Sequence, residues 1–216
     1  MIDLLLQAVQ FVLHLDVHLD ELVANYGTWI YAILFLIIFC ETGLVVMPLL
    51  PGDSLLFAAG AVAASGRLDV VFLCVLLVTA AMLGNAVNYW VGRLAGIELQ
   101  RRFPRLIRQQ YLDRTRAYFE RFGGKTIIIA RFVPIVRTVA PFAAGVGQMT
   151  HLRYQFYNVL GSVLWVLLLV LAGYFFANVP IVRENFSAVI IGIIIVSVLP
   201  AIVEIARARL RALHGR

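Results

Sequence analysis

Long apolar runs without charged residues alternate with short polar stretches along this chain. Three long uncharged runs cover 70–92, 154–182 and 185–203, and 22–40 is a fourth. A helix needs about 20 apolar residues to span a bilayer, so each run is long enough to cross. The predicted transmembrane helices are 70–94, 153–178 and 186–205. The pattern therefore predicts an all-α polytopic membrane protein with about three full spans.

Two further apolar segments, 27–64 and 126–149, are interrupted by helix-breaking residues. A proline lacks the backbone donor and clashes with the preceding turn, so it ends or kinks a helix. The predicted breaks are Pro48, Pro51 and Gly52 in the first segment and Pro134 and Pro141 in the second. Each segment is therefore expected to form a hairpin of two short helices.

The net charge of +6 is concentrated in two regions. Between Arg93 and Lys125 there are nine Lys or Arg residues against three acids, and the tail adds four arginines. Cytoplasmic loops of membrane proteins are enriched in Lys and Arg, which explains this balance without a nucleic-acid partner. Both regions are therefore placed in the cytoplasm. Two full spans already connect them, so 126–149 is expected to enter the membrane and return.

The first half permits the mirror image of this arrangement. Residues 1–21 hold four acids and no Lys or Arg, so they are expected outside the cytoplasm. Segment 27–64 then returns to its starting side, either as two crossings or as a hairpin, and its central break favours the hairpin. The predicted organisation is an interfacial amphipathic segment at 1–25, one membrane domain at 26–206 with a basic loop and amphipathic helix at 95–125, and a basic cytoplasmic tail at 207–216.

A short internal repeat links the two halves of the chain. Phe57-Ala-Ala-Gly60 recurs as Phe142-Ala-Ala-Gly145, each time after a proline-containing break. Inverted repeats whose broken helices meet near the membrane centre are typical of transporters. The repeat therefore favours an inverted arrangement with two opposed re-entrant helical hairpins.

Four charged residues lie inside the two broken segments. Glu41 and Asp53 belong to the first segment, and Arg131 and Arg137 belong to the second. A charge at the bilayer centre costs about 2.5–3.5 kcal/mol, and such residues usually face a cavity or one another and are functional. A turn at the breaks would bring the two carboxylates together and let both guanidinium groups aim at one point.

The residue types indicate two uses for these charges. Two close carboxylates in a low dielectric hold a proton more tightly than an isolated carboxylate does. This property suits Glu41 and Asp53 to proton coupling. Arginine stays charged when buried and binds phosphate oxygens through a bidentate fork, which suits Arg131 and Arg137 to a phosphate headgroup. The structural alternative is that the acids only neutralise the arginines and hold the hairpins together.

A second polar line lies on the span 70–94. Its members are Asn85, Asn88 and Tyr89, which could line a cavity. Small residues also recur every four positions there, including Gly84 and Gly92. This spacing lets helices approach closely, so helix packing is expected and a homodimer is compatible with it. The chain has no motif of a metal site or of a catalytic centre, so no metal, cofactor or enzymatic activity is predicted.

Three motifs of this chain resemble the DedA family of bacterial inner-membrane proteins, which shares its domain with the eukaryotic VTT (SNARE-associated Golgi) proteins. The motifs are FCETGLVVMPLLPGD at 39–53, GNAVNY at 84–89, and GGK followed by ARFVPIVRTVAPFAAG within 123–145. The resemblance extends over about residues 20–210, nearly the whole chain.

The resemblance implies two opposed re-entrant hairpins in the inner membrane, with a periplasmic N-terminus and a cytoplasmic C-terminus. It also implies transport of undecaprenyl phosphate, or of a phospholipid such as phosphatidylethanolamine, driven by the proton motive force. The essential acids of the family correspond to Glu41 and Asp53, and its essential arginines to Arg131 and Arg137. Many relatives carry Asp where this chain has Asn85, so a proton role for that carboxylate does not transfer.

Three hypotheses follow for the function. The first is a transporter that moves a lipid phosphate, in which the arginines bind the phosphate while the acids exchange protons. The second is a proton or cation antiporter in which the carboxylates form the ion site and the arginines are structural. The third is a membrane enzyme acting on lipid phosphate, which has no placed nucleophile to support it.

Overall fold

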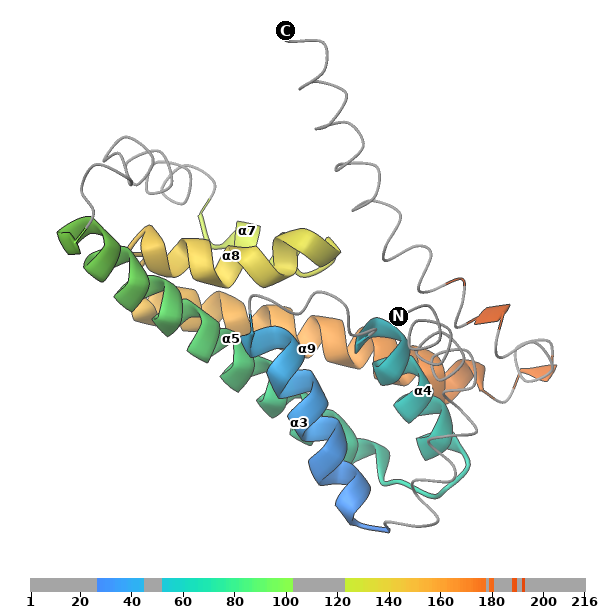
Figure 1. Cartoon of the computed structure of the whole chain (residues 1–216). Coiled ribbons are helices and arrows are strands. Elements are labelled where there is room, and N and C mark those ends of the chain that lie inside the picture. Colours follow the sequence, from blue (N-terminus) through green and yellow to red (C-terminus); the bar gives the residue numbers. More distant parts are fainter. Residues whose placement is uncertain are drawn as a thin grey trace, which may run out of the picture. The chain divides into compact units, whose positions relative to one another are not determined.

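The computed structural model describes residues 27–44, 52–102 and 123–177, with isolated positions between 179 and 192. The helices in these residues are α3 (Trp29–Gly43), α4 (Gly52–Ala64), α5 (Val70–Arg102), α7 (Lys125–Ala130), α8 (Pro134–Val146) and α9 (His151–Phe176) (Figure 1). The prediction of an all-helical chain is confirmed for this part. The predictions for 1–25, the amphipathic helix within 95–125, most of 186–205, the tail 207–216, Pro48 and Pro51 lie outside the described residues.

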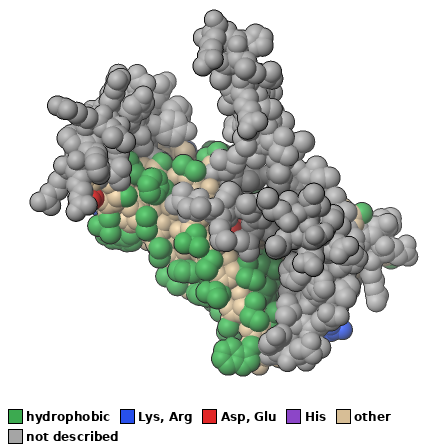
Figure 2. Space-filling model, viewed as in Figure 1, with side chains coloured by type: hydrophobic (Ala, Val, Ile, Leu, Met, Phe, Trp, Pro, Cys, Tyr) green, Lys and Arg blue, Asp and Glu red, His purple; other side chains and the backbone are tan. Residues whose placement is uncertain are grey.

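The helices α5 and α9 are long and apolar enough to cross a membrane, over Val70–Ala95 and His151–Phe176. Beyond this apolar part α5 continues to Arg102, further than the predicted end at 94. Along α9 the exposed apolar residues recur every four positions, at Leu152, Phe156, Leu160, Leu164 and Leu168. Hydrophobic side chains also cover the visible face of the described helices (Figure 2).

Polar side chains of α9 lie inside the protein instead. Asn158 and Ser162 are both 0% exposed, although their neighbours on the outer face are leucines. A soluble protein shows the reverse distribution, with polar groups mostly at the surface. Apolar residues outside and hydrogen-bonded polar residues inside are what a helix in contact with lipid requires.

The remaining helices are shorter than a membrane span. They contain 15 residues in α3, 13 in α4, 6 in α7 and 13 in α8. At about 1.5 Å per residue, a helix of 13 residues reaches about 20 Å, against about 30 Å for the hydrocarbon core. A straight helix of any of these lengths is therefore too short to cross the hydrocarbon core alone.

The break at Pro134 is confirmed. The α7 helix ends at Ala130, and α8 begins at Pro134 after a turn. Val133 has φ −117° and ψ 108°, the extended conformation that a following proline imposes. The prediction of a break at Pro141 is wrong, because α8 continues through this residue. The cost there is one backbone hydrogen bond, since Pro141 has no N–H to donate to the Arg137 carbonyl one turn earlier.

The described residues form two compact units. One contains residues 27–34, 52–76 and 166–177, and the other contains 35–44, 77–102 and 123–165. The helices α3, α5 and α9 contribute residues to both units. The internal repeat noted in the sequence has one copy in each unit, so the packing of each copy can be described within its own unit.

In the first unit, α4 crosses α9 with almost no space between the backbones. A Cβ atom added to Gly60 would collide with the Val170 carbonyl, and one added to Gly173 would collide with the Phe57 carbonyl. Only glycine fits where two helix backbones approach this closely. The first Phe-Ala-Ala-Gly segment is therefore a helix-crossing motif.

In the second unit, α8 crosses α5 in the same way. A Cβ on Gly145 would collide with the Tyr89 carbonyl, and one on Gly92 would collide with the Phe142 carbonyl. The two copies thus make equivalent crossings. The partner helix contributes two contact residues three positions apart in each case, Val170 and Gly173 on α9 and Tyr89 and Gly92 on α5. On α5, Gly84 is equally close to Thr42 of α3. Packing within the chain, as predicted, accounts for the small-residue face of α5.

Candidate functional site

Glu41 and Arg137 form a buried ion pair in the second unit. Glu41 lies near the end of α3 and Arg137 in the first turn of α8. Nη2 of Arg137 donates to Oε1 of Glu41 over 2.6 Å, and their side chains are 12% and 2% exposed, respectively. One predicted acid and one predicted base from opposite halves of the sequence are therefore brought together.

Arg131 caps the C-terminus of α7 and is buried among neutral polar groups. It is 5% exposed, and its Nη2 atom lies 3.3 Å from Oδ1 of Asn158. Asn85 lies beside it: with the amide oxygen turned towards Arg131, Asn85 accepts from Nη2 and donates to the Thr42 carbonyl. Among the described residues, Nη1 of Arg131 has no hydrogen-bond partner.

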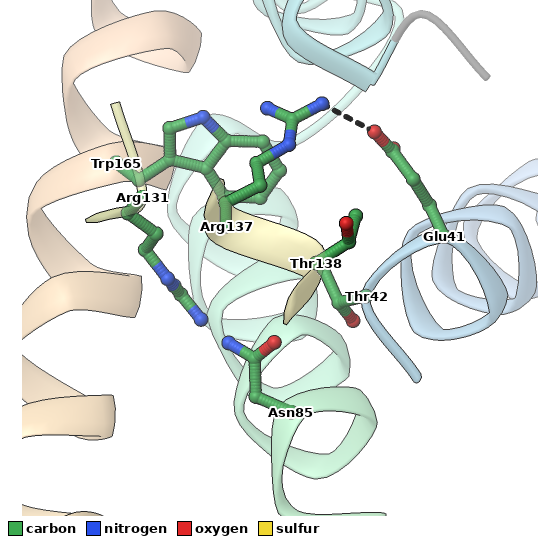
Figure 3. A pocket seen from close by; sticks show the side chains of 7 residues that line it. All are labelled: Glu41, Thr42, Asn85, Arg131, Arg137, Thr138 and Trp165. Atoms are coloured by element: carbon green, nitrogen blue, oxygen red, sulfur yellow. Dashed lines mark hydrogen bonds and ion pairs between the residues drawn. The ribbon is translucent and has the colours of Figure 1, made fainter. Parts of the chain in front are cut away.

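Trp165 of α9 lies against both arginines. The guanidinium carbon is 5.6 Å from the ring centroid for Arg131 and 5.2 Å for Arg137. Both distances are within the range of a cation–π interaction. Arg131 extends from the ring towards Asn85, whereas Arg137 extends towards Glu41 (Figure 3). The sequence predicted that the two guanidinium groups would aim at one point. In this structure they share the Trp165 ring but extend in different directions (Figure 3).

These residues line a small polar pocket among apolar helices. The lining residues are Glu41, Thr42, Asn85, Arg131, Arg137, Thr138 and Trp165. Its cavity volume is about 10 Å³, which is room for about one water molecule. A phosphate group therefore enters only if a side chain moves, and the Glu41 carboxylate already occupies the position of an anion beside Arg137.

Two of the three predicted cavity residues on α5 have other roles. Asn88 is fully buried, and its Nδ2 donates to the carbonyls of Thr138 at 2.9 Å and Thr42 at 3.3 Å. Tyr89 donates its hydroxyl to the Met149 carbonyl at 2.5 Å. Neither residue lines the pocket, because both point to backbone of α3, α8 or the end of the second broken segment. Asn85 alone of this group lines it.

Asp53 belongs to the first unit, at the start of α4. It is half-buried, in the first helical turn, where a carboxylate is favoured by the helix dipole. Its predicted proximity to Glu41 stays a prediction, since Glu41 belongs to the other unit. Gly52, the predicted break before it, is the first residue of α4.

Trp165 and Asn158 were not identified from the sequence. Both lie in an apolar run of a predicted span, where an aromatic residue or a single amide has no distinguishing local signal. Asn158, Ser162 and Trp165 do share the spacing of one helix face. A search for polar residues on that face of α9, like the one made on α5, would have found Asn158.

Comparison with known proteins identifies relatives along nearly the whole chain. The VTT domain family matches residues 50–175. Protein DedA of Escherichia coli (strain K12) is 56% identical over 208 residues, covering 95% of each chain. An uncharacterized membrane protein of Mycobacterium leprae is 42% identical over 168 residues, covering 77% of this chain and 75% of its own. No solved structure matches the chain.

A third relative is the inner membrane protein YqjA of Escherichia coli (strain K12), 35% identical over 153 residues and covering 70% of each chain. The names of these relatives agree with the length and apolar composition of α5 and α9, and this is a multi-pass membrane protein. A family match over more than half of the chain, together with 56% identity over 95% of it, settles the relationship. The chain belongs to the DedA family of VTT-domain membrane proteins.

Proposed function

We propose that this protein transports a phosphate-bearing lipid across the bacterial inner membrane and couples the movement to protons. The observation that carries the proposal is the buried pair of Arg137 and Glu41 beside a second buried arginine, Arg131. Arginine binds phosphate oxygens through a planar fork and stays charged in apolar surroundings. Undecaprenyl phosphate and phosphatidylethanolamine, the lipids that the family resemblance implies, both supply such oxygens.

The two broken segments act as opposed re-entrant hairpins. Helices α3, α4, α7 and α8 are each too short to cross the hydrocarbon core. Irregular backbone is tolerated inside a membrane only where protein or a wet cavity surrounds it, and the turn before α8 carries the buried Arg131. The basic loop 95–125 and the tail 207–216 face the cytoplasm, and the N-terminus faces the periplasm.

The proton enters through Glu41. In the ionised form this carboxylate holds Arg137 and occupies the place of an anion. Protonation weakens the pair and frees the guanidinium group for a phosphate oxygen, whereas loss of the proton returns the carboxylate to Arg137 and displaces the phosphate. Asp53 serves as the second proton acceptor. The lipid is moved without a chemical change, so the protein acts as a transporter and needs no cofactor.

Reconstitution into proteoliposomes tests this function. Transbilayer movement of undecaprenyl phosphate and of phosphatidylethanolamine is measured for the wild type, for Arg137→Ala and for Glu41→Gln. We expect Arg137→Ala to lose transport and Glu41→Gln to lose its pH dependence. Equal rates for Arg137→Ala and the wild type would exclude the phosphate clamp. An unchanged pH profile in Glu41→Gln would exclude the proton role.

A second candidate is a proton or cation antiporter with structural arginines. The observation in its favour is that both guanidinium groups pack on Trp165 and that the pocket has room for about one water. Lysine keeps the charge of arginine but loses the fork. Full activity of the double variant Arg131→Lys/Arg137→Lys would therefore support structural arginines, and loss of activity would support the phosphate clamp.

A further inference from the structure

We infer that the two arginines play different parts in binding an anion. Arg131 has the neutral Asn85 beside it in place of an acid, so it is a standing anion site, one that is available whether or not Glu41 is protonated. Arg137 binds an anion only after its ion pair with Glu41 has broken. The inference rests on the proposed function and adds a rule for the headgroup. One oxyanion of the phosphate binds Arg131, after the side chains that line the pocket move apart, at any protonation state of Glu41. A second oxyanion binds Arg137 and needs a proton on Glu41.

The groups of α5 and α9 that contact Arg131 are neutral, and the charged group that shares the Trp165 ring with it is another arginine, Arg137 of α8. From α9 it meets Asn158 and the Trp165 ring, and from α5 it meets Asn85. Its polar contacts within residues 27–44, 52–102 and 123–177 include no carboxylate at ion-pair distance. At 5% exposure, with Nη1 lacking a partner there, this guanidinium group is a buried charge that a ligand can compensate.

The Asn158 amide beside Arg131 is fixed in orientation. Asn158 donates through Nδ2 to the Met82 carbonyl and to Oε1 of Gln155, both at 3.0 Å, so its oxygen is the atom turned towards Arg131. Tyr154 donates its hydroxyl to the backbone carbonyl of Asn85 at 2.9 Å and so joins α9 to α5 beside this site. The neutral Asn158 oxygen therefore accepts from the guanidinium group without balancing its charge.

Arg137 has the opposite arrangement, because a carboxylate lies 2.6 Å from its Nη2 atom. The charged groups lining the pocket are Glu41, Arg131 and Arg137, and Tyr154 is a further titratable neighbour of Arg131. A phosphate diester carries one negative charge and can be held by Arg131 alone. A phosphate monoester carries close to two at neutral pH, so full binding also requires Arg137 and hence protonation of Glu41.

The test introduces a carboxylate beside Arg131 without changing the shape of the side chain. Asn85→Asp places an anion against Nη2 of Arg131, and Asn85→Ser is the neutral control that also loses the amide. Binding of a short-chain phosphatidylglycerol, a diester, and of farnesyl phosphate, a monoester, is measured on purified protein in nanodiscs at neutral pH. Glu41→Gln is measured with the same two probes, and thermal unfolding confirms that each variant is folded.

We expect Asn85→Asp to weaken binding of both lipids by about tenfold or more, well beyond the effect of Asn85→Ser. Glu41→Gln is expected to strengthen monoester binding more than diester binding. Equal binding by Asn85→Asp and Asn85→Ser would overturn the standing site while leaving the proposed function intact. Equal effects of Glu41→Gln on both lipids would overturn the division of roles. If the wild type binds neither lipid, the proposed function itself fails together with this inference.

Discussion

Nη2 of Arg137 lies 2.6 Å from Oε1 of Glu41, in a buried contact that joins the start of α8 to the end of α3. Such a pair is a poor source of stability, because removing two charges from water offsets much of their attraction. A packed apolar contact would join the same helices. In the proposed function, the pair is a contact that breaks and re-forms when an anion enters.

Replacing Glu41 by Gln removes the competing anion and keeps the size of the side chain. We expect lipid phosphate to bind more tightly at neutral pH, since Arg137 no longer has a carboxylate partner in this position. Transport is expected to fall by about tenfold or more, because no carboxylate returns to displace the phosphate. Binding and transport are measured on the same preparation. Weaker binding together with normal transport would contradict the exchange mechanism.

Replacing Trp165 tests the shared aromatic platform. A buried cation–π contact contributes about 2 kcal/mol, and the Trp165 ring contacts two guanidinium groups. We expect Trp165→Leu to lower the affinity for a lipid phosphate by about tenfold and Trp165→Phe to lower it less. Equilibrium binding to both variants decides this. If Leu and Phe are equivalent, the ring acts only by filling space.

Asn88 is expected to matter for stability. Its amide nitrogen connects the carbonyls of Thr42 and Thr138, and therefore holds α3 and α8 against α5. Asn88→Leu removes both hydrogen bonds and leaves buried carbonyl groups without that donor, at a cost of about 1–3 kcal/mol. Thermal unfolding in detergent measures the loss. A variant as stable as the wild type would show that the contact is dispensable.

The two helix crossings give a matched pair of predictions. Gly60→Ala and Gly145→Ala each place a methyl group against a backbone carbonyl, in the first and the second unit respectively. Since the neighbouring atom is backbone, we expect both variants to be destabilised, by about 1–3 kcal/mol. Gly161→Ala is the control, because a Cβ there meets its nearest atom at 3.4 Å. Comparable stability of all three variants would contradict the tight crossings.

Several residues of the pocket could be predicted because charged residues are rare in membrane-spanning segments and stand out in the sequence. Glu41, Arg131 and Arg137 stand out in apolar segments, where a charge needs a partner or a cavity, and the structure brings all three to one pocket. The repeat at Phe57 and Phe142 was visible in the sequence, but its meaning as a backbone crossing depends on close approach of a second helix.

Other features depend on tertiary contacts that no local pattern records. The sequence of α9 shows one tryptophan in an apolar run, and only folding places Trp165 on both arginines. Pro141 has the local signal of a break, yet α8 continues through it. The direction of each guanidinium group could not be predicted either, because it is set by Asn85, Asn158 and Glu41 from other helices.

The central claim is that Arg137 must meet a phosphate and does more than balance Glu41. The most direct test is lipid transport by the charge-swapped double variant Glu41→Arg/Arg137→Glu, which retains an ion pair between α3 and α8. A folded protein without transport of undecaprenyl phosphate or phosphatidylethanolamine is the predicted result, since the fork at the start of α8 is gone. Transport restored to the wild-type rate would contradict the account, because it would show that the pair alone is needed.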